Sequence, residues 1–241
     1  MKPGIALLLR AAGSLAAVAV LAGAGWYGYD ALARKPVAAV RFTGEAARVN
    51  AVELERLSAG LRGRESREVS LAAVREAVRK LPWVRDCAVR RVFPGTLEVS
   101  IEAHVPLARW DDARLVSVRG EVFAADYEAP LPRFTGPEGA AAEMAAAWVG
   151  IGRAAGPLAS PVAELRLSAR RAWQARLASG LVIELGRGEI EARLARFAAA
   201  WPLLAGSAAG ATHADLRYPN GFALRGVAAE ERRNAPKGRR A

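Results

Sequence analysis

The chain has 241 residues, 52% of them hydrophobic, and a formal net charge of +11 at pH 7. That length and apolar content can form one large or two small cores, which excludes a chain that is disordered throughout. The charge raises the question of a nucleic-acid partner, but acidic residues are interleaved with the basic ones along most of the chain, and only four of the 35 basic residues are lysine. Many arginines together with abundant alanine are typical of the codon usage of a GC-rich genome. The positive charge therefore does not by itself indicate nucleic-acid binding, and we expect no nucleic-acid partner.

An uncharged run of about 19 residues extends from Ala11 to Tyr29. At about 1.5 Å per residue, a helix of this length crosses the roughly 30 Å of hydrocarbon in a bilayer. Trp26 and Tyr27 stand near its far end, and aromatic side chains favour the membrane interface. We therefore predict a single transmembrane helix at 11–30 that contacts the lipid bilayer, preceded by a cytoplasmic tail at 1–10.

A cleavable signal peptide is the alternative interpretation of this run, because Ala22, Gly23 and Ala24 offer a small-residue cleavage site. Against it, the run is longer than the roughly 7–15 apolar residues of a signal peptide. Both interpretations export the rest of the chain from the cytoplasm. The lone Cys87 excludes an intrachain disulfide, and its expected role is that of a small buried strand residue.

The exported part begins with the order strand, helix, helix, strand, strand. Residues 37–42 form the first expected strand, and Asn50 is expected to cap a helix that runs to about Leu61. Ser70 caps the next helix, in which apolar residues recur at three- and four-residue spacing up to Leu81. A small three-stranded sheet with two helices on one face fits this order.

Residues 80–110 carry the most informative part of this pattern. Pro82 cannot continue the helix, and from Leu97 to Val105 apolar and polar residues alternate as in a half-buried strand. Pro94 and Gly95 supply the tight turn before that strand. A helix end, a strand, a turn and a second strand therefore follow one another without a long loop.

The rest of the chain has short apolar runs separated by turns. Hairpins are expected around Gly120, Gly180 and Asn220, the last with Leu216 and Tyr218 on one arm and Phe222 and Leu224 on the other. Helices are expected at 137–152 and 190–201. These elements predict an α+β domain built on an antiparallel sheet with two helices.

Five segments form a specific pattern when taken together: LEVSIEAHVPLARW (97–110), RLVSVRGEVF (114–123), LPRFTGPEG (131–139), AWQARLASGLVIELG (172–186) and DLRYPNGFALR (215–225). In this order they resemble the FtsQ/DivIB family of bacterial cell-division proteins. The resemblance implies an α+β chain with a POTRA domain (β-α-α-β-β) at 36–105 and an FtsQ-type β domain at 106–227. The charged segment 62–71 departs from the family pattern. The basic tail at 228–241 is expected to be disordered.

Catalysis has little support in the sequence. The chain has two histidines and one cysteine, and it lacks the metal-binding and nucleophile motifs of common hydrolases. His104 and His213 are expected to be structural or surface residues, and Asp111 and Asp112 to lie in a solvated turn. We therefore expect no enzyme activity, no metal, no cofactor and no small-molecule substrate.

Partner binding has better support, near the end of the chain. A strand there is expected at a sheet edge, where a partner strand can dock on unpaired backbone groups. The alternative is that its aromatic side chains complete the core. The resemblance implies that the segment binds the division protein FtsB. The expected partner-binding residues are Tyr218, Asn220, Gly221, Phe222, Ala223, Leu224 and Arg225.

The resemblance also implies a role. It predicts a non-enzymatic scaffold, anchored in the inner membrane by a single span at the division septum, that links early and late division proteins through FtsB and FtsL and helps control septal peptidoglycan synthesis. The alternative is a POTRA-containing component of an outer-membrane transport or secretion system, which requires tandem POTRA units or a following barrel. A periplasmic hydrolase would instead require a cluster of His104, His213 and carboxylates.

Overall fold

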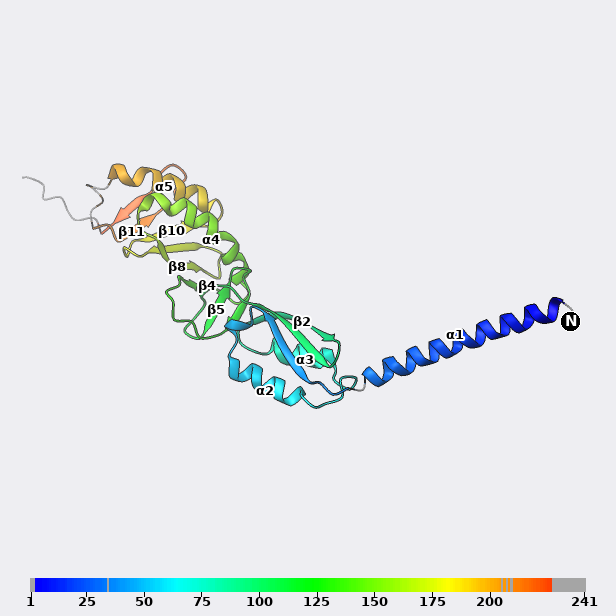
Figure 1. Ribbon diagram of the computed structural model, residues 1–241. Coiled ribbons are helices and arrows are strands. Elements are labelled where there is room, and N and C mark those ends of the chain that lie inside the picture. The colour runs from blue at the N-terminus through cyan, green and yellow to red at the C-terminus, as the bar shows by residue number, and fades with distance from the viewer. Residues whose placement is uncertain (1–2, 34, 205, 207, 209, 227–241) are drawn as a thin grey trace, which may run out of the picture. The chain divides into compact units, whose positions relative to one another are not determined.

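The computed structural model describes residues 3–33, 35–204, 206, 208 and 210–226, with residues 3–13 and 31–33 described by their backbone alone. The predicted tail at 228–241 lies outside the described residues. The chain divides into two compact units, Met1–His104 and Val105–Ala241, which are taken one at a time below (Figure 1).

The first unit begins with helix α1, Pro3–Ala33, which is longer at both ends than the predicted 11–30 (Figure 1). Its described side chains from Ser14 to Tyr27 are exposed. Among the helices of the described chain, none meets the joint requirement of length and apolar content for crossing a bilayer. The transmembrane helix and the cytoplasmic tail at 1–10 therefore stay predictions.

A three-stranded sheet with two helices follows α1 in the predicted chain order. Strand β3 is central, with β1 parallel to it on one side and β2 antiparallel on the other. The elements are β1 (Ala39–Gly44), the 3-10 turn η1 (Ala46–Arg48), α2 (Ala51–Leu61), α3 (Leu71–Arg79), β2 (Val84–Val92) and β3 (Thr96–Ala103).

Both helices of this unit begin at the predicted caps. The Asn50 side chain accepts a hydrogen bond from Val52 N at 2.9 Å, and the Ser70 hydroxyl accepts one from Ala73 N at 3.3 Å. Each cap provides a partner for a backbone N–H that the first helical turn leaves unpaired. The predicted starts of α2 and α3 are confirmed.

The alternation along β3 decides which face of the sheet the helices cover. Leu97, Val99 and Ile101 are 3% exposed or less, and they share one hydrophobic cluster with Leu54 of α2 and Val78 of α3. The intervening polar side chains are turned to the other face. Both helices therefore cover the same face, as the sequence predicted.

The predicted buried face is wrong at its last position. Val105 is 41% exposed, because β3 ends at Ala103 and the chain turns there toward the second unit. Before β3, Gly95 has a φ of +74°, and a Cβ on it would lie 2.8 Å from the Pro36 carbonyl oxygen. This turn packs against the start of β1, where Ala38 N donates a hydrogen bond to Gly95 O at 2.8 Å.

The second unit has a nine-stranded sheet within its described residues, in the order β12-β11-β10-β9-β8-β7-β4-β5-β6. Its strands are β4 (Pro106–Arg109), β5 (Arg114–Ser117), β6 (Val122–Ala124), β7 (Arg133–Thr135), β8 (Val162–Leu167), β9 (Trp173–Leu177), β10 (Val182–Gly186), β11 (His213–Asp215) and β12 (Ala223–Arg225). The hairpins predicted around Gly120 and Gly180 are confirmed as β5–β6 and β9–β10.

The sheet is mixed, which corrects the predicted antiparallel sheet. In the described chain β4–β7, β7–β8 and β10–β11 are parallel pairs. Parallel neighbours need a long crossover connection, and helices provide two of them. Helix α4 (Ala141–Ala155), followed by the 3-10 turn η2 (Gly156–Leu158), joins β7 to β8, and helix α5 (Ile190–Leu204) joins β10 to β11.

The helix boundaries also differ from the predictions. Helix α4 begins at Ala141 and not at Pro137, because Gly139 adopts a φ of +81° and Ala140 N donates to the Pro137 carbonyl in a turn. Helix α5 includes Pro202 in its last turn and continues to Leu204. A proline close to a helix end removes one backbone hydrogen bond without stopping the helix.

Both helices of the second unit lie on one side of its sheet (Figure 1). The core between them has Phe134, Met144, Ile183 and Phe197 among its members, each 1% exposed or less. The opposite face of the central strands is polar, with Arg176 paired to Glu164 at 3.1 Å. The helices therefore cover one face of the sheet, and the other face carries polar pairs along its central strands, although Leu115 and Val182 on that face are buried too.

The burial pattern of β3 yields a stability prediction. Ile101→Asp places an unpaired carboxylate in the core and is expected to lower the free energy of unfolding by about 3 kcal/mol or more. Ser100→Asp, the same new side chain one residue away on the open face, is expected to cost less than about 0.5 kcal/mol. Urea unfolding of both variants measures this, and equal losses would mean that the face is misassigned.

Candidate partner-docking edge

Strand β12 lies at one edge of the large sheet. It pairs with β11 in an antiparallel register that matches His213 with Arg225, Ala214 with Leu224 and Asp215 with Ala223. Within the described residues, no strand pairs with its other side. An edge strand of this kind leaves backbone N–H and C=O groups that another strand can use.

The predicted final hairpin forms with a longer loop than expected. Its arms are β11 and β12, so Leu216, Tyr218 and Phe222 lie in the loop between them. The backbone ladder between β11 and β12 is therefore confined to 213–215 and 223–225. Leu216 is 2% exposed, and its N–H donates to the Glu184 carbonyl at 2.9 Å, which ties the loop to β10.

The predicted binding residues separate into an exposed and a half-buried group. Tyr218 is 54% exposed, and Asn220, Gly221 and Arg225 are exposed too. The half-buried group is Phe222, Ala223 and Leu224. The segment thus combines surface-accessible side chains with side chains that reach the core.

Phe222 is the residue that joins this segment to α5. Its ring packs edge-on against Phe197, with ring centroids 5.0 Å apart and an interplanar angle of 81°. Phe197 in turn lies 5.2 Å from the Trp201 ring, and both Phe222 and Leu224 pack against the main core. Arg196 of α5 also donates a hydrogen bond to the Pro219 carbonyl at 3.1 Å. Aromatic pairs of this geometry are favourable, so α5 holds the loop in place.

One hollow lies at β12 and another lies beside the loop that precedes it. One, of about 260 Å³, lies on the polar face and is lined by Glu184, His213, Asp215, Arg217 and Arg225, with parts of Ala214 and Ala223. The other, of about 280 Å³, lies between α5 and the loop, where its lining residues are Arg193, Arg196, Phe197, Leu216, Asn220, Gly221 and Phe222. The first hollow is therefore next to the β12 edge, and the second is next to the loop that leads into it.

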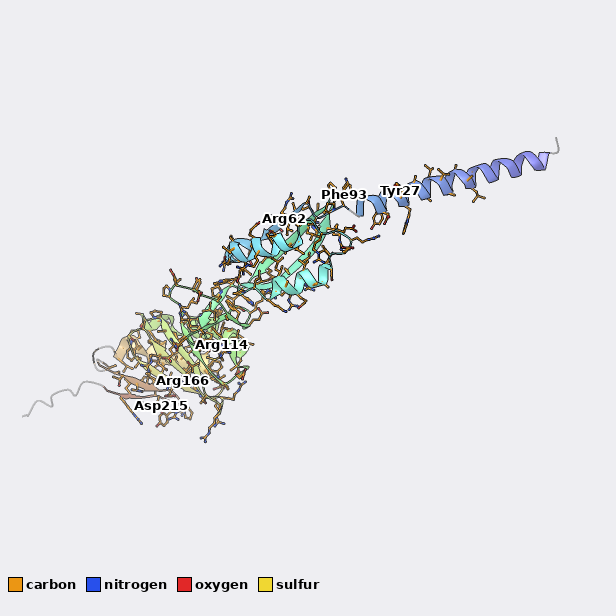
Figure 2. The ribbon with its side chains drawn as sticks, turned by 90° about the horizontal axis from the view of Figure 1, so that it is seen from below. Tyr27, Arg62, Phe93, Arg114, Arg166 and Asp215 are labelled. Atoms are coloured by element: carbon orange, nitrogen blue, oxygen red, sulfur yellow. The ribbon has the colours of Figure 1, made fainter. Side chains whose placement is uncertain are left out.

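The lining of the polar hollow includes an ion pair between Arg217 and Asp215. Arg217 donates to Asp215 through Nε at 2.8 Å and through Nη2 at 2.6 Å, and its backbone N–H adds a third bond at 3.1 Å. The Arg217 side chain lowers the pKa of Asp215 below its usual value, against the opposing effect of burial, and the backbone N–H acts in the same direction. Asp215 raises the pKa of Arg217. Figure 2 labels Asp215 on β11.

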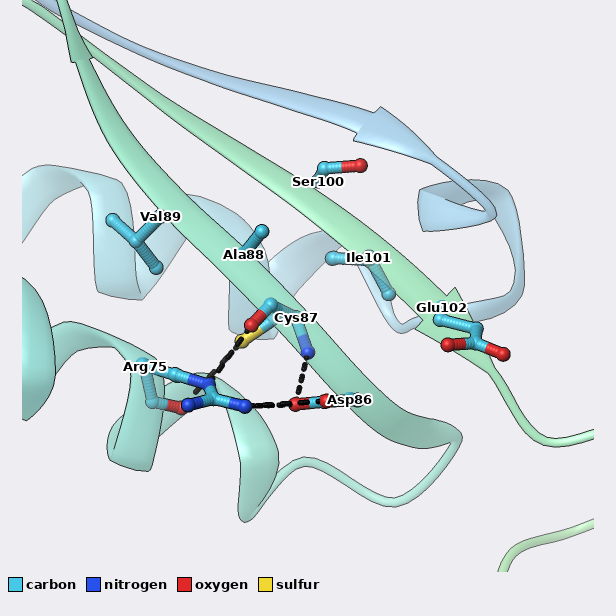
Figure 3. A pocket seen from close by; sticks show the side chains of 8 residues that line it. All are labelled: Arg75, Asp86, Cys87, Ala88, Val89, Ser100, Ile101 and Glu102. Carbon is cyan, nitrogen blue, oxygen red and sulfur yellow. Dashed lines mark hydrogen bonds and ion pairs between the residues drawn. The ribbon is translucent and has the colours of Figure 1, made fainter.

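Edge strand β2 of the first unit differs from β12, because a side chain of α3 and one of β2 itself bond to the backbone of Cys87. Arg75 Nε donates to the Cys87 carbonyl at 3.0 Å, and the Asp86 carboxylate accepts from Cys87 N at 2.8 Å. Arg75 and Asp86 also pair with each other at 2.9 Å (Figure 3). Arg75 lowers the pKa of Asp86, so the carboxylate stays charged. Side chains that occupy an edge in this way discourage a further strand from pairing there.

Groups that could support catalysis are not gathered in one place. His104 and His213 lie in different units, and the described residues hold no group of three or more His, Cys, Asp or Glu side chains suited to a metal ion. Asp111 accepts hydrogen bonds from Ala113 N at 2.9 Å and Arg114 N at 2.7 Å, which is the role of a turn residue.

Several residues of the site were missed by the sequence analysis. Strand β11, the pair of Asp215 with Arg217, and Arg193 and Arg196 of α5 were not predicted to contribute. The expected helix at 190–201 carried Phe197 and Trp201 on one stripe, but nothing local indicates that this stripe meets Phe222, which lies 25 residues after Phe197 in the sequence.

Comparison with family models identifies both units. Residues 35–104 match the model described as POTRA domain, FtsQ-type, and residues 108–217 match the one described as cell division protein FtsQ/DivIB, C-terminal. The second match ends one residue before Tyr218, so the predicted docking segment follows directly on the matched region.

Curated relatives agree with the family models. The cell division protein FtsQ of Burkholderia pseudomallei is 37% identical over 235 residues, covering 92% of each chain. The FtsQ proteins of Nitrosospira multiformis and Escherichia coli are 41% identical over 160 residues and 33% identical over 153 residues. The first of these two alignments covers 66% of this chain and 68% of the relative, and the second covers 60% and 55%.

The shifted pKa of Asp215 yields a pH prediction. A carboxyl group whose pKa is lower in the folded state stabilises the fold above its unfolded pKa of about 3.9, and this contribution is lost as the pH falls through the lower folded value. Asp215→Asn is therefore expected to lower the melting temperature at neutral pH, with a difference from wild type that shrinks below about pH 4. Thermal melts across this pH range measure the effect.

Asp112→Asn is the matched control. Its side chain is 94% exposed, so the change is expected to alter stability by less than about 0.5 kcal/mol at every pH. An Asp215→Asn protein with a constant difference from wild type between pH 7 and about pH 3 would contradict the assignment of the pH dependence to Asp215.

Proposed function

The chain belongs to the FtsQ/DivIB family of cell-division proteins, and from this premise we propose that it is a non-enzymatic scaffold whose β12 edge binds a strand of FtsB. Through FtsB it joins FtsL and links early to late division proteins, and so helps control septal peptidoglycan synthesis. The family also makes the alternative, a component of an outer-membrane transport system, the less favoured reading.

The observation that carries the proposal is the edge position of β12 beside an exposed aromatic residue. Strand pairing supplies affinity through the backbone, and side chains beside the edge supply specificity. Tyr218, at 54% exposure, is available as an anchor next to the three-residue ladder of 223–225. Large aromatic side chains at the centre of an interface contribute most of its binding free energy.

The two hollows support the same mode of binding. Successive side chains of an added strand point to opposite faces of the sheet. One set would enter the polar hollow beside Asp215 and Arg225, and the other would enter the hollow beside Phe222 and α5. The side chains of the bound strand would thus contact the protein on both faces of the sheet, while its backbone would extend the sheet by one strand.

The membrane anchor forms part of this proposal. Helix α1 carries exposed apolar side chains, among them Leu15 at 72%, Leu21 at 72% and Trp26 at 73% exposure. Apolar side chains that contact water along a helix are costly, and a bilayer would remove this cost. A single span at 11–30 would leave the N-terminus in the cytoplasm and both described units in the periplasm, at the division septum.

The docking proposal predicts separate effects for the two aromatic residues. Tyr218→Ala is expected to weaken FtsB binding by about 2 kcal/mol or more, roughly 30-fold in Kd, with an unchanged melting temperature. Phe222→Ala is expected to cost about 2–4 kcal/mol of stability, because its ring packs on Phe197. Binding by titration calorimetry and thermal melts on the same proteins distinguish the two roles.

Val122→Ala is the control, since Val122 is a 40% exposed apolar side chain on β6, at the opposite edge of the same sheet. It should leave FtsB binding unchanged. Wild-type affinity in Tyr218→Ala would remove Tyr218 from the interface. If Val122→Ala weakened binding as much as Tyr218→Ala, the partner would be using the other edge.

The anchor predicts the topology of the whole chain. A reporter enzyme fused after Ala241 is expected to be active when it requires the periplasm and inactive when it requires the cytoplasm. The protein should also remain in the membrane fraction after an alkaline wash. A mature N-terminus at Gly25 would instead identify a cleaved signal peptide.

A further inference from the structure

The residues that follow α1 form a continuous surface with the loop at 62–69. Residues 35–37 pair with the loop at 62–69 through a bridge between Pro36 and Glu65 and through a bond from Val37 N to the Arg64 carbonyl at 2.8 Å. Ser66 N donates to the Lys35 carbonyl at 3.1 Å. The loop is therefore fixed to the first residues after the helix.

Strand β2 and the turn after it complete this surface. Arg91, at the end of β2, donates to the Ser66 carbonyl at 3.0 Å and to the Val69 carbonyl at 2.6 Å. The turn at 93–95 bonds to Ala38 through the Gly95 carbonyl at 2.8 Å. We call the group made by Lys35, Arg62, Arg64, Arg67, Arg91 and Phe93 the entry surface. All six side chains are exposed.

The entry surface is basic. It carries five cationic side chains, and the loop adds two carboxylates, Glu65 and Glu68. Arg62 pairs with Glu55 at 2.9 Å and Arg67 with Asp30 of α1 at 3.3 Å. Within the part of the chain that the structure describes, the side chains of Lys35 and Arg64 make no ion pair. Among the described residues, Glu65 and Glu68 make no ion pair either, so the basic character of the surface comes from its five cations exceeding the two loop carboxylates.

Phe93 is the apolar member of the entry surface. Its side chain is 67% exposed, although it lies next to a turn that packs tightly against β1. Figure 2 labels it at the end of the unit where the chain enters. An exposed aromatic ring on the same surface as several cations is the composition of a site that lies at a membrane interface, where rings enter the headgroup layer.

Chain length limits how far this surface can be from a bilayer. Helix α1 ends at Ala33, so three helical residues and at most three further residues separate residue 30 from Pro36. Even with those three fully extended, the distance from residue 30 to Pro36 is at most about 15 Å. The headgroup layer takes up about 5–7 Å of that distance beyond the hydrocarbon. The remainder is about one Debye length at physiological salt, so Pro36 and the loop that pairs with it lie close enough for their cations to reach the headgroup charges when this end of the unit faces the bilayer.

From these observations we infer that the entry surface binds the anionic lipid headgroups next to the membrane anchor, with Phe93 inserted among them. The inference rests on the proposed span at 11–30. Lipid contact would hold the first unit against the bilayer. The loop at 62–69, which is more charged than the rest of the unit's surface, would act as the lipid-facing element.

The test uses the full chain reconstituted in vesicles of phosphatidylcholine alone or with phosphatidylglycerol. In a Cys87→Ser background, Phe93→Cys or Val52→Cys is labelled with an environment-sensitive fluorophore. Val52 is the matched control, since it is 64% exposed and lies at the other end of α2, about 14 Å from Leu61 along the helix. A blue shift and quenching by brominated lipid are expected at position 93 alone, only with phosphatidylglycerol, and should decrease at about 1 M salt.

A second experiment removes the positive charges of Lys35 and Arg64. Lys35→Gln with Arg64→Gln is expected to lower the equilibrium constant for lipid contact about 25-fold, at about fivefold per cation. An equally water-exposed label at positions 93 and 52 in phosphatidylglycerol vesicles would overturn the inference while leaving the anchor intact. Release of the protein from the vesicles by an alkaline wash would overturn the anchor and the inference together.

Discussion

An open β-sheet has two edge strands, and the backbone groups along each edge need partners. This constraint organises both units of the chain. At β2 the Arg75 and Asp86 side chains bond to the N–H and C=O of Cys87, so that edge is occupied from within. At β12 no described side chain bonds to the backbone of Ala223 or Leu224. The contrast between β2 and β12 is one reason for the proposal that another strand adds at β12.

Local sequence patterns predicted most of the sheet and the two helices that follow α1 in the first unit. Asn50 and Ser70 stand where helices need an acceptor for unpaired N–H groups, and the alternation from Leu97 to Ala103 fixes which side of β3 faces the helices. The caps and the alternation depend on residues only a few positions apart, so they can be predicted from a short stretch of sequence. The exposed Val105 was missed because the alternation continues in the sequence after the strand has ended.

The second unit was less predictable because its pairing is not local. The parallel contacts of β7 with β8 and of β10 with β11 join segments separated by whole helices, and no turn residue marks them. The edge position of the final strand was expected from its place near the chain end, yet its ladder is shorter and its loop longer than the pattern of Tyr218 and Phe222 suggested. The packing of Phe222 on Phe197 has no local signal at all.

The short length of β12 also explains why the edge depends on α5. A strand of three residues paired on one side gains little stability from its own ladder. The loop before it is held instead by the Phe222 ring against Phe197 and by the bond from Arg196 to the Pro219 carbonyl. Because these contacts order the strand before a partner arrives, a docking segment would not have to supply that ordering, and more of its interaction free energy would remain as affinity. Because the loop before β12 rests on α5, a substitution in this part of the core would also change the geometry of the proposed binding edge.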